Sequence, residues 1–374
     1  MPVKSSQPTT TIKTIYPARP KEDVRERKLC TIREGPTREF APSVAGERAR
    51  LIRMNEEKWV NGTLLHYAFF EDGGAWSGSN ALKSQARQAF QRWQDLGIGL
   101  RFEEVQDRTQ AQVRIGFLLD DGHWSYIGRE VRRQGVDDRT MNLDPMDGIE
   151  NGEYGVEVAC HEIGHTLGFP HEHQNPNAGI VWDEEAVYRA LAAPPNRWSR
   201  DKTFYNIIRK IEPDAIQGSS WDPNSVMHYP FGPGLILKPE EYTLAGLRPA
   251  GGLSERDKQW VKTFYPAETA NDYEILPLLT SKQLSITAGQ QRNFILRPTV
   301  TRYYEMRTFG ASDTVMVLNE RDDQQNELYL TGDDDSGEDR NAYIRLRLQA
   351  GREYVMRLRL YYAAAAGDTG VMWW

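Results

Sequence analysis

Four of the seven histidines of this 374-residue chain lie in one fourteen-residue stretch, HEIGHTLGFPHEHQ. Imidazole nitrogens are the commonest metal ligands in proteins, and a carboxylate beside them can carry a proton. Residues four apart share a helix face, so His161 and His165 project together, with Glu162 one step round the helix. Gly168 can end that helix in a left-handed conformation, which lets His171 swing back toward the first two histidines.

Three imidazoles that converge on one point, with a fourth position open, meet the requirement of a catalytic zinc ion. Bound zinc lowers the pKa of a water molecule to about 7 and polarises a carbonyl group. Glu162 is placed to take that proton and pass it to a leaving amine. A bare HExxH recurs by chance in helices, whereas HExxHxxGxxH is the metzincin signature. The stretch therefore predicts a zinc peptidase site, and the alternative is a group of histidines that binds nothing.

The elements that position this site follow from hydrophobic periodicity. TLLHYAFF, LRFEEV and AQVRIGFLL predict strands, and NALKSQARQAFQRWQDLG predicts a helix that stops at Gly97. YGVEVACHEIGHTLG predicts the histidine helix, and LSERDKQWVKTFYP predicts a later helix with Ser254 as its N-cap. We expect a mixed sheet with a helix packed across it. Beyond residue 271 the chain alternates as strands do, which predicts a separate β domain.

The charge divides the chain unevenly. Residues 1–54 carry 12 Lys/Arg and 6 Asp/Glu, a balance of +6. Because the whole chain has a net charge of −7, the remaining residues carry −13. This Pro-, Thr- and Arg-rich segment has no sustained periodicity, so it is interpreted as an extended arm, either solvated or docked on the acidic body. The predicted domains are therefore a basic arm (1–55), a metallopeptidase domain (56–267) and a β domain (268–374).

Composition also limits partners and location. The chain is 39% hydrophobic and 26% charged, as a soluble globular protein is, and its mild net charge of −7 does not favour nucleic acid. No apolar run approaches the roughly 18 residues of a membrane helix. The first residues contain no apolar core of a secretory signal, so export would follow another route or a removed leader.

Three motifs resemble the astacin family of metzincin peptidases. HEIGHTLGFPHE is similar to the astacin zinc signature, SVMHYP (Ser225–Pro230) to its Met-turn, and GHWSYIG (Gly122–Gly128) to its GCWSYVG. The resemblance implies an α+β fold: a two-subdomain catalytic domain, with a twisted mixed sheet and helices, followed here by a small all-β sandwich. It implies a secreted zinc endopeptidase that acts on proteins or peptides, with one zinc per chain.

The same resemblance implies roles for residues around the zinc. Met227 would form the floor beneath the metal. Tyr229 would be a metal ligand that swings away to stabilise the oxyanion. Glu172 would meet the new amino terminus after a pro-segment is removed, between about residues 48 and 59; the alternative is a surface glutamate without a partner. A matrixin-like metzincin is disfavoured by the residues that follow His171 and the MH of SVMHYP.

The chain departs from the family in its cysteines. His123 stands where the family has a cysteine, and it is interpreted as a loop or packing residue rather than an extra metal ligand. The chain has two cysteines, Cys30 and Cys160. A thiolate binds zinc well, so Cys30 could block the zinc of a latent precursor, with the pro-segment as an intramolecular inhibitor. The alternative is a free or buried cysteine. Cys160 is expected to pack in the body.

The tail is open to two interpretations. Its strands resemble the C-terminal β-sandwich appended to many secreted bacterial peptidases. An acidic loop carries Asp333, Asp334 and Asp335, whose oxygens suit calcium. The alternative is a solvated hairpin loop. If the tail binds a glycan or protein, the zinc unit could be a catalytically weak scaffold, but degenerate copies commonly lose the base, and Glu162 and Tyr229 are both present.

Overall fold

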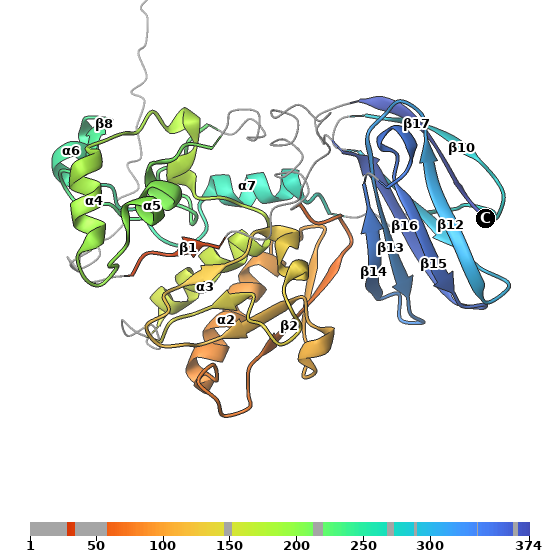
Figure 1. The fold of residues 1–374 in the computed structure, drawn as a ribbon, viewed down its shortest axis with the longest axis horizontal. Helices are drawn as coiled ribbons and strands as arrows, with labels where there is room; N and C mark the ends of the chain where they lie inside the picture. The colour runs from red at the N-terminus through yellow and green to blue at the C-terminus, as the bar shows by residue number, and fades with distance from the viewer. Residues whose placement is uncertain are drawn as a thin grey trace, which may run out of the picture.

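The computed structural model describes residues 28–33, 58–145, 152–211, 220–267, 273–287, 290–334, 336–361 and 366–374. Figure 1 shows two bodies, a mixed helix-and-sheet body and an all-β body that lies to its right. The expected order of a mixed α+β domain followed by a β-sandwich is therefore confirmed. Within the described residues, no helix combines the length and the apolar character needed to cross a membrane.

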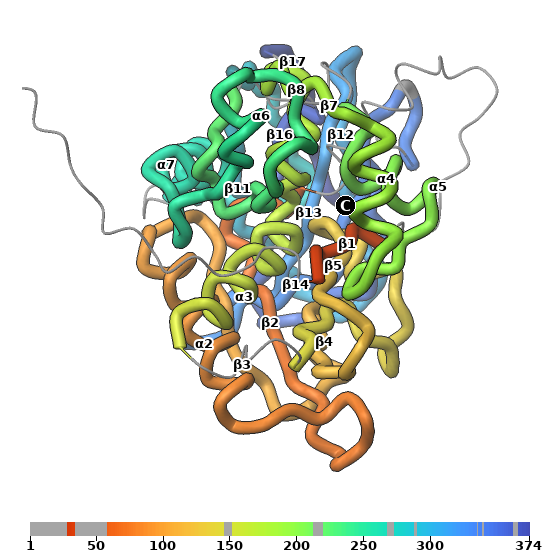
Figure 2. The backbone as a smooth tube through the Cα atoms, turned by 90° about the vertical axis from the view of Figure 1, so that its left-hand side faces the viewer, coloured from red at the N-terminus to blue at the C-terminus, as the bar shows by residue number. Residues whose placement is uncertain are grey.

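The first body is built on a six-stranded sheet. Its members, in order across the sheet, are β1 (Thr31–Ile32), β5 (Trp124–Ser125), β6 (Met141–Asn142), β4 (Val113–Gly116), β2 (Leu64–Phe69) and β3 (Arg101–Glu104). Pairs β2–β3, β2–β4 and β4–β6 are parallel, whereas β5 runs antiparallel to β6. The edge strand β1 comes from the arm and pairs in parallel with β5 (Figure 2).

Two helices cover this sheet. In α2 (Asn80–Gln94) the apolar residues recur at helical spacing, and the Ser79 side chain caps its first turn. Buried Phe90 and Trp93 of this helix pack in one core with α3 (Glu153–Thr166), the histidine helix. Trp93 also donates from Nε1 to the Cys160 carbonyl of α3 at 3.1 Å, which fixes the two helices against each other.

A second, less regular half faces the histidines from the other side. It contains the helices and strands α4 (Glu184–Ala192), α5 (Arg200–Thr203), a π-helical turn (Phe204–Ile208), β7 (Val181–Trp182), β8 (Ile236–Lys238), α6 (Glu241–Ala245) and α7 (Glu255–Phe264). This half also contains short 3₁₀ turns at Glu172–Gln174 and Pro176–Ala178, whereas those at Arg108–Gln110 and Gly128–Arg133 lie between strands of the six-stranded sheet. Its core joins Trp182, Ile207, Phe231 and Tyr229 to Cys30 of the arm. In Figure 1, β1 lies between this half and α3.

The second body is a β-sandwich. One sheet has the order β10 (Lys282–Ile286), β17 (Gly367–Trp373), β12 (Arg302–Phe309), β15 (Tyr343–Leu348). The other has the order β14 (Glu327–Asp333), β13 (Thr314–Arg321), β16 (Glu353–Leu360), β11 (Gln291–Leu296), β9 (Tyr273–Ile275). A 3₁₀ turn, Glu338–Arg340, precedes β15. Alternate residues of the two inner faces, such as Met306, Leu358 and Trp373, form one apolar core.

The two bodies meet at the start of the first one. Val60 packs in a small buried cluster with Val315, Val317 and Tyr361 of the sandwich. Gln291 donates to the Asn61 carbonyl at 3.2 Å. These contacts tie the sandwich to the segment that leads into β2.

Candidate metal centre

The histidine helix presents its ligands as the sequence spacing predicts. His161 and His165 both lie on α3, and their rings are in contact with centroids 4.8 Å apart. Gly168 follows the helix with φ of 94°, a conformation that side chains disfavour, and it turns the chain back. The ring of His171 then stands 4.7 Å from that of His165, centroid to centroid. All three histidines are at most 8% exposed.

Backbone carbonyls fix which nitrogen of each helix histidine faces inward. Nδ1 of His161 lies 2.7 Å from the Val226 carbonyl, and Nδ1 of His165 lies 2.7 Å from the Phe169 carbonyl. A carbonyl only accepts, so both Nδ1 atoms carry hydrogen and both Nε2 atoms present lone pairs. Second partners of this kind commonly orient metal-ligating histidines.

The Met-turn lies directly beneath α3. A Cβ at Gly164 would come 2.3 Å from the Met227 sulfur, so only glycine lets the helix approach this methionine. The backbone N–H of Glu172 donates to the Met227 carbonyl at 3.0 Å. Met227 therefore touches the helix between its two histidines, and its role as the floor beneath the metal stays a prediction.

Glu162 is fully buried beside the histidines, and burial raises its pKa to about 8. Its Oε2 accepts a hydrogen bond from the Cys30 thiol at 3.3 Å, while Oε1 has no partner among the described residues. Burial and the neighbouring Glu162 carboxylate raise the pKa of Cys30 well above its ordinary value. The site therefore holds a protonated thiol that is hydrogen-bonded to a buried carboxyl group.

Tyr229 contacts both the histidines and the arm. Its hydroxyl donates to the Cys30 carbonyl at 2.6 Å and also lies against Nε2 of His171. Burial raises the pKa of this phenol well above its ordinary value, so it carries its proton near neutral pH. The tyrosine is thus a hydrogen-bond donor aimed at a peptide carbonyl in the site.

The residues present fit a zinc ion. Ligand atoms of Cys30, His161, His165 and His171 all lie within 4.8 Å of one another. Burial lowers the pKa of His161 to about 4 and that of His165 and His171 well below the ordinary value, so the rings are neutral, as ligands must be. Buried Nε2 of His161 has no protein partner among the described residues, and three imidazoles with one thiol form a donor set that zinc prefers.

Three of the other histidines bond to backbone groups of the protein. His123 accepts at Nδ1 from the Asp144 backbone N–H at 3.1 Å. His173 lies 2.9 Å from the Asn206 carbonyl, and His228 lies 2.8 Å from the Tyr229 carbonyl. The packing interpretation of His123 therefore agrees with its position.

The remaining predicted residues also have defined contacts. Glu172 accepts at Oε1 from the Asp222 backbone N–H at 3.0 Å and from the Asn175 side chain at 3.2 Å. Asp333 accepts from the backbone N–H of Ser336 and of Tyr343, at 3.0 and 2.8 Å. Asp335, the third candidate calcium ligand, lies outside the described residues, and the calcium site stays a prediction.

Sequence reasoning missed Asp257, which supports the site from α7. Its carboxylate accepts from the Ser225 hydroxyl at 2.6 Å and from the Val226 N–H at 2.8 Å. Val226 is the residue whose carbonyl orients His161. The only sequence signal was the capping box of α7, in which Asp257 also bonds Ser254.

The backbone contacts of the arm were also outside sequence reasoning, which left the arm either solvated or docked and placed only its cysteine at the zinc. The Leu29 N–H donates to Asn196 Oδ1 at 2.8 Å, and the Ile32 N–H donates to Asn206 Oδ1 at 3.0 Å. Residues 28–33 therefore lie extended across the site, anchored through their backbone. No local pattern announces such contacts, because each joins residues far apart in the chain.

Comparison with known proteins agrees with this site. Residues 52–232 match the sequence family described as Astacin, a family of peptidases. Zinc metalloproteinase nas-36 of Haemonchus contortus is 29% identical over 190 residues, 50% of this chain and 26% of the relative. Bone morphogenetic protein 1 of Xenopus laevis is 28% identical over 209 residues, 54% of this chain and 25% of the relative. The chain therefore spans about a quarter of these relatives.

A solved structure is similar to the first body. The structure of myroilysin superposes with a TM-score of 0.51 and 28% identity, covering 57% of this chain and 98% of that one. In its sequence match and in its fold, the region of residues 52–232 is therefore similar to the astacin family of peptidases.

Proposed function

We propose that this chain is a zinc-dependent endopeptidase. The observation that supports this most directly is the convergence of three neutral imidazoles on one point, with a buried glutamate beside them. His161, His165 and His171 would hold the metal. When bound there, zinc supplies Lewis-acid activation of water and of a peptide carbonyl.

The protein side chains would supply the proton transfers and the oxyanion contact. Glu162, whose pKa is raised to about 8 by burial, suits a group that takes a proton from the attacking water and gives it to the leaving amine. Tyr229 would donate to the carbonyl oxygen as negative charge develops there. Its hydrogen bond to the Cys30 carbonyl is the same kind of contact, made to the arm.

The test separates metal binding from proton transfer. Glu162→Gln should keep one zinc per chain and lose hydrolysis of a peptide library by about 10²–10⁴-fold, the usual contribution of general acid–base catalysis. Glu157→Gln, on the same helix, is the matched control. Elemental analysis without zinc, or full activity of Glu162→Gln, would contradict the proposal.

We also propose that the chain is a latent precursor inhibited through Cys30. Residues 28–33 occupy the site: the thiol bonds the proposed base, and the carbonyl takes the proposed oxyanion donor. Among the described residues, this thiol and the three histidines form the cluster of potential ligand atoms. As a thiolate it would be a fourth ligand, and Glu162 is placed to take its proton.

Two cysteine variants test latency. The full chain should be inactive until the arm is cut, whereas Cys30→Ala should be active without a lag. Cys160→Ala, which removes the other buried thiol, should stay latent. Cobalt-loaded protein should show a thiolate-to-metal absorption that only Cys30→Ala removes. Equal activity of intact and cut protein would refute latency.

The alternative of a binding protein on a catalytically weak scaffold is not favoured, because the base and the tyrosine both face the ligand cluster. Secretion and a peptide or protein substrate remain predictions from the family resemblance. They would be checked by locating the protein in cells that make it and by mapping its cleavage sites.

A further inference from the structure

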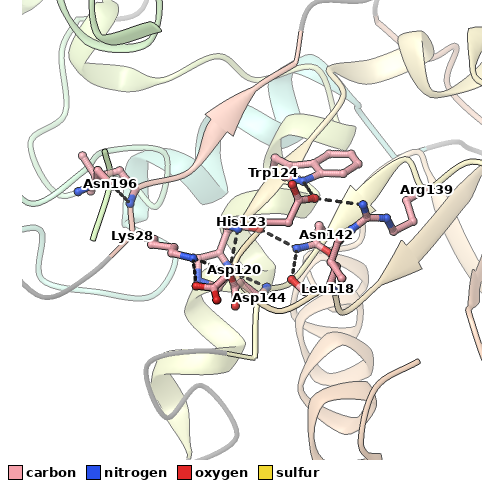
Figure 3. Close-up of polar contacts among 12 residues, drawn as sticks. Lys28, Leu118, Asp120, His123, Trp124, Arg139, Asn142, Asp144 and Asn196 are labelled. Atoms are coloured by element: carbon pink, nitrogen blue, oxygen red, sulfur yellow. Dashed lines mark hydrogen bonds and ion pairs between the residues drawn. The ribbon is translucent and has the colours of Figure 1, made fainter. Parts of the chain in front are cut away.

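Lys28 of the arm is seated between two carboxylates of the helix-and-sheet body. Its Nζ lies 2.9 Å from Asp120 Oδ1 and 3.3 Å from Asp144 Oδ2 (Figure 3). The lysine side chain is only 11% exposed, and that of Asp144 is 1% exposed. We call Asp120 and Asp144 the carboxylate cradle. Although burial alone would lower it, the two carboxylates raise the pKa of Lys28.

The cradle is built by the catalytic body, independently of the arm. The Asn142 side chain donates to the Leu118 and Gly122 carbonyls, at 3.1 and 2.7 Å, and so pins the loop that carries Asp120. Asp144 accepts from the Gly122 N–H at 2.7 Å. None of these bonds involves the arm, so the catalytic body itself holds Asp144 and the Asp120 loop in place, whereas the Asp120 side chain is 71% exposed.

Arg33, the other cation of the docked segment, meets a different environment. It lies 3.3 Å from Asp121, but Asp121 also pairs with Arg139 at 3.1 Å and accepts from the Trp124 indole at 2.8 Å. Asp121 therefore already has a protein cation. Within the described residues, Asp120 has Lys28 as its one ion-pair partner. An incoming cation would therefore gain more binding free energy at the cradle than at Asp121.

The register of the arm places the cradle near the reacting bond. Lys28 precedes Cys30 by two residues, and the Cys30 carbonyl accepts from Tyr229. The segment is extended and pairs with β5 through Thr31. At about 3.3 Å per residue, the cradle receives a side chain roughly 7 Å along the chain from the carbonyl at the tyrosine. A peptide bound in place of the arm would bring its own side chains to this cradle.

We propose that the Asp120–Asp144 cradle is a specificity subsite that selects a lysine side chain in substrates. The arm uses this subsite when it is docked, and a substrate uses it when the arm has left. This inference rests on the proposed peptidase function and adds a substrate class to it: peptides with a basic residue close to the cleaved bond. A partly buried ammonium held by two carboxylates forms charge-assisted hydrogen bonds, which are stronger than neutral ones.

The test uses the full chain with Lys28→Gln and Cys30→Ala, which keeps the arm attached but vacates the cradle. Peptides blocked at both ends carry lysine or its uncharged analogue norleucine at each position within three residues of the cleaved bond. The blocked ends ensure that only a side-chain ammonium is tested. We expect about a 10-fold preference in kcat/KM for lysine at one position, the size of one or two charge-assisted hydrogen bonds.

Asp120→Asn should bring this preference close to unity, because it removes the charge and keeps the shape. Asn also tolerates the left-handed backbone of Asp120, whose φ is 68°, so the variant should fold. Asp144→Asn should act in the same direction. The matched control is Glu103→Gln, which removes one charge from β3 at the opposite edge of the sheet and should keep the preference.

Binding to the further variant Glu162→Gln gives a readout that does not need hydrolysis. The lysine peptide should bind about 10-fold more tightly than the norleucine peptide, and Asp120→Asn should abolish the difference. Loss of all hydrolysis with this binding difference intact would refute the peptidase proposal and support the subsite. Hydrolysis with no preference at any position, or a preference unchanged by Asp120→Asn, would overturn the subsite.

Discussion

The metal centre and the arginine cluster of the sandwich both bury polar side chains, and they satisfy them differently. In the sandwich, Arg357 is fully buried and pairs with Glu327 at 2.6 Å. Glu327 also accepts from Arg321 at 2.8 Å and from Asn319 at 2.9 Å. Although burial alone would raise it, these partners, Arg357 foremost, lower the pKa of Glu327. Glu353, 3.4 Å from Arg321, supplies a second carboxylate, so two acids balance the two arginines.

The metal centre has no such internal balance. Its imidazoles are neutral, and Nε2 of His161 and Oε1 of Glu162 have no partner among the described residues. Burying a polar group without a partner is costly, so these atoms suit a metal ion that completes the site. In the sandwich, Asn319 Oδ1 and Arg321 Nε also lack hydrogen-bond partners among the described residues. The two buried clusters therefore differ in charge: the sandwich pairs its arginines with its own carboxylates, whereas the described residues of the metal centre form no such ion pair.

Removing a metal ligand should have the largest effect. His165→Ala should lose zinc and reduce turnover by about 10⁴-fold or more, since enzymes supply about 10⁶-fold or greater enhancements that would depend here on the metal. Zinc at 100 times its Kd should stabilise the parent chain by about 2.7 kcal/mol and not the variant. Elemental analysis and thermal unfolding check both. His66→Gln, a remote histidine change, should retain zinc. Zinc retention in His165→Ala would show that this histidine is not needed to hold the metal.

Unpairing the sandwich cluster should come next. Glu327→Gln leaves Arg357 and Arg321 buried without their carboxylate, which should cost about 3–5 kcal/mol of unfolding free energy. Zinc content should not change. Urea unfolding measures the loss, and Glu255→Gln, at an exposed ion pair, should leave the unfolding free energy nearly unchanged.

The double change Glu327→Leu with Arg357→Met should recover part of that stability, because it removes both charges together. A double variant as unstable as Glu327→Gln would show that the cluster stabilises the folded protein through packing rather than through balanced charge.

Tyr229→Phe should have a smaller effect, confined to turnover. Loss of one oxyanion donor should lower kcat by about 10²-fold, while KM and zinc content stay nearly constant, because the hydroxyl acts mainly in the transition state. Steady-state kinetics on the arm-free or Cys30→Ala enzyme provide the measurement. Tyr242→Phe is the control, and an equal kcat in Tyr229→Phe would assign the tyrosine to packing alone.

The smallest effect is expected at Lys58, a cation near the domain junction. Burial and the nearby Arg359 lower the pKa of Lys58 from 10.5 to about 7. Between these two values the unfolded chain binds a proton that the folded chain has released, so this group makes stability rise with pH. At pH 7 and below, the buried ammonium is destabilising.

Lys58→Met should therefore stabilise the chain by about 1 kcal/mol near pH 7, the scale of one poorly compensated polar group, and by nothing measurable above pH 10. Urea unfolding across this pH range measures the difference. Lys262→Met, on the exposed side of α7, should show no such trend. A stabilisation that does not fade with pH would show that packing against Phe264, 4.1 Å from the ammonium, governs this site instead.

Local sequence determined the parts of this protein that depend on short spacing. His161, Glu162 and His165 share a helix, and Gly168 turns the chain so that His171 joins them, all within eleven residues. Alternation likewise predicted the strands of the sandwich. These predictions succeeded because helix and strand periods are properties of neighbouring residues.

Tertiary structure alone decided which distant residues meet. Cys30 reaches Glu162 across 132 residues and Tyr229 across 199, and Lys28 reaches Asp144 across 116. The sequence offered Cys30 as a possible zinc ligand but gave no sign of the buried Arg357–Glu327 pair, whose arginine stands in an alternating run like any exposed one. Pairings of this kind depend on how complete elements pack, and packing leaves no periodic trace in the chain.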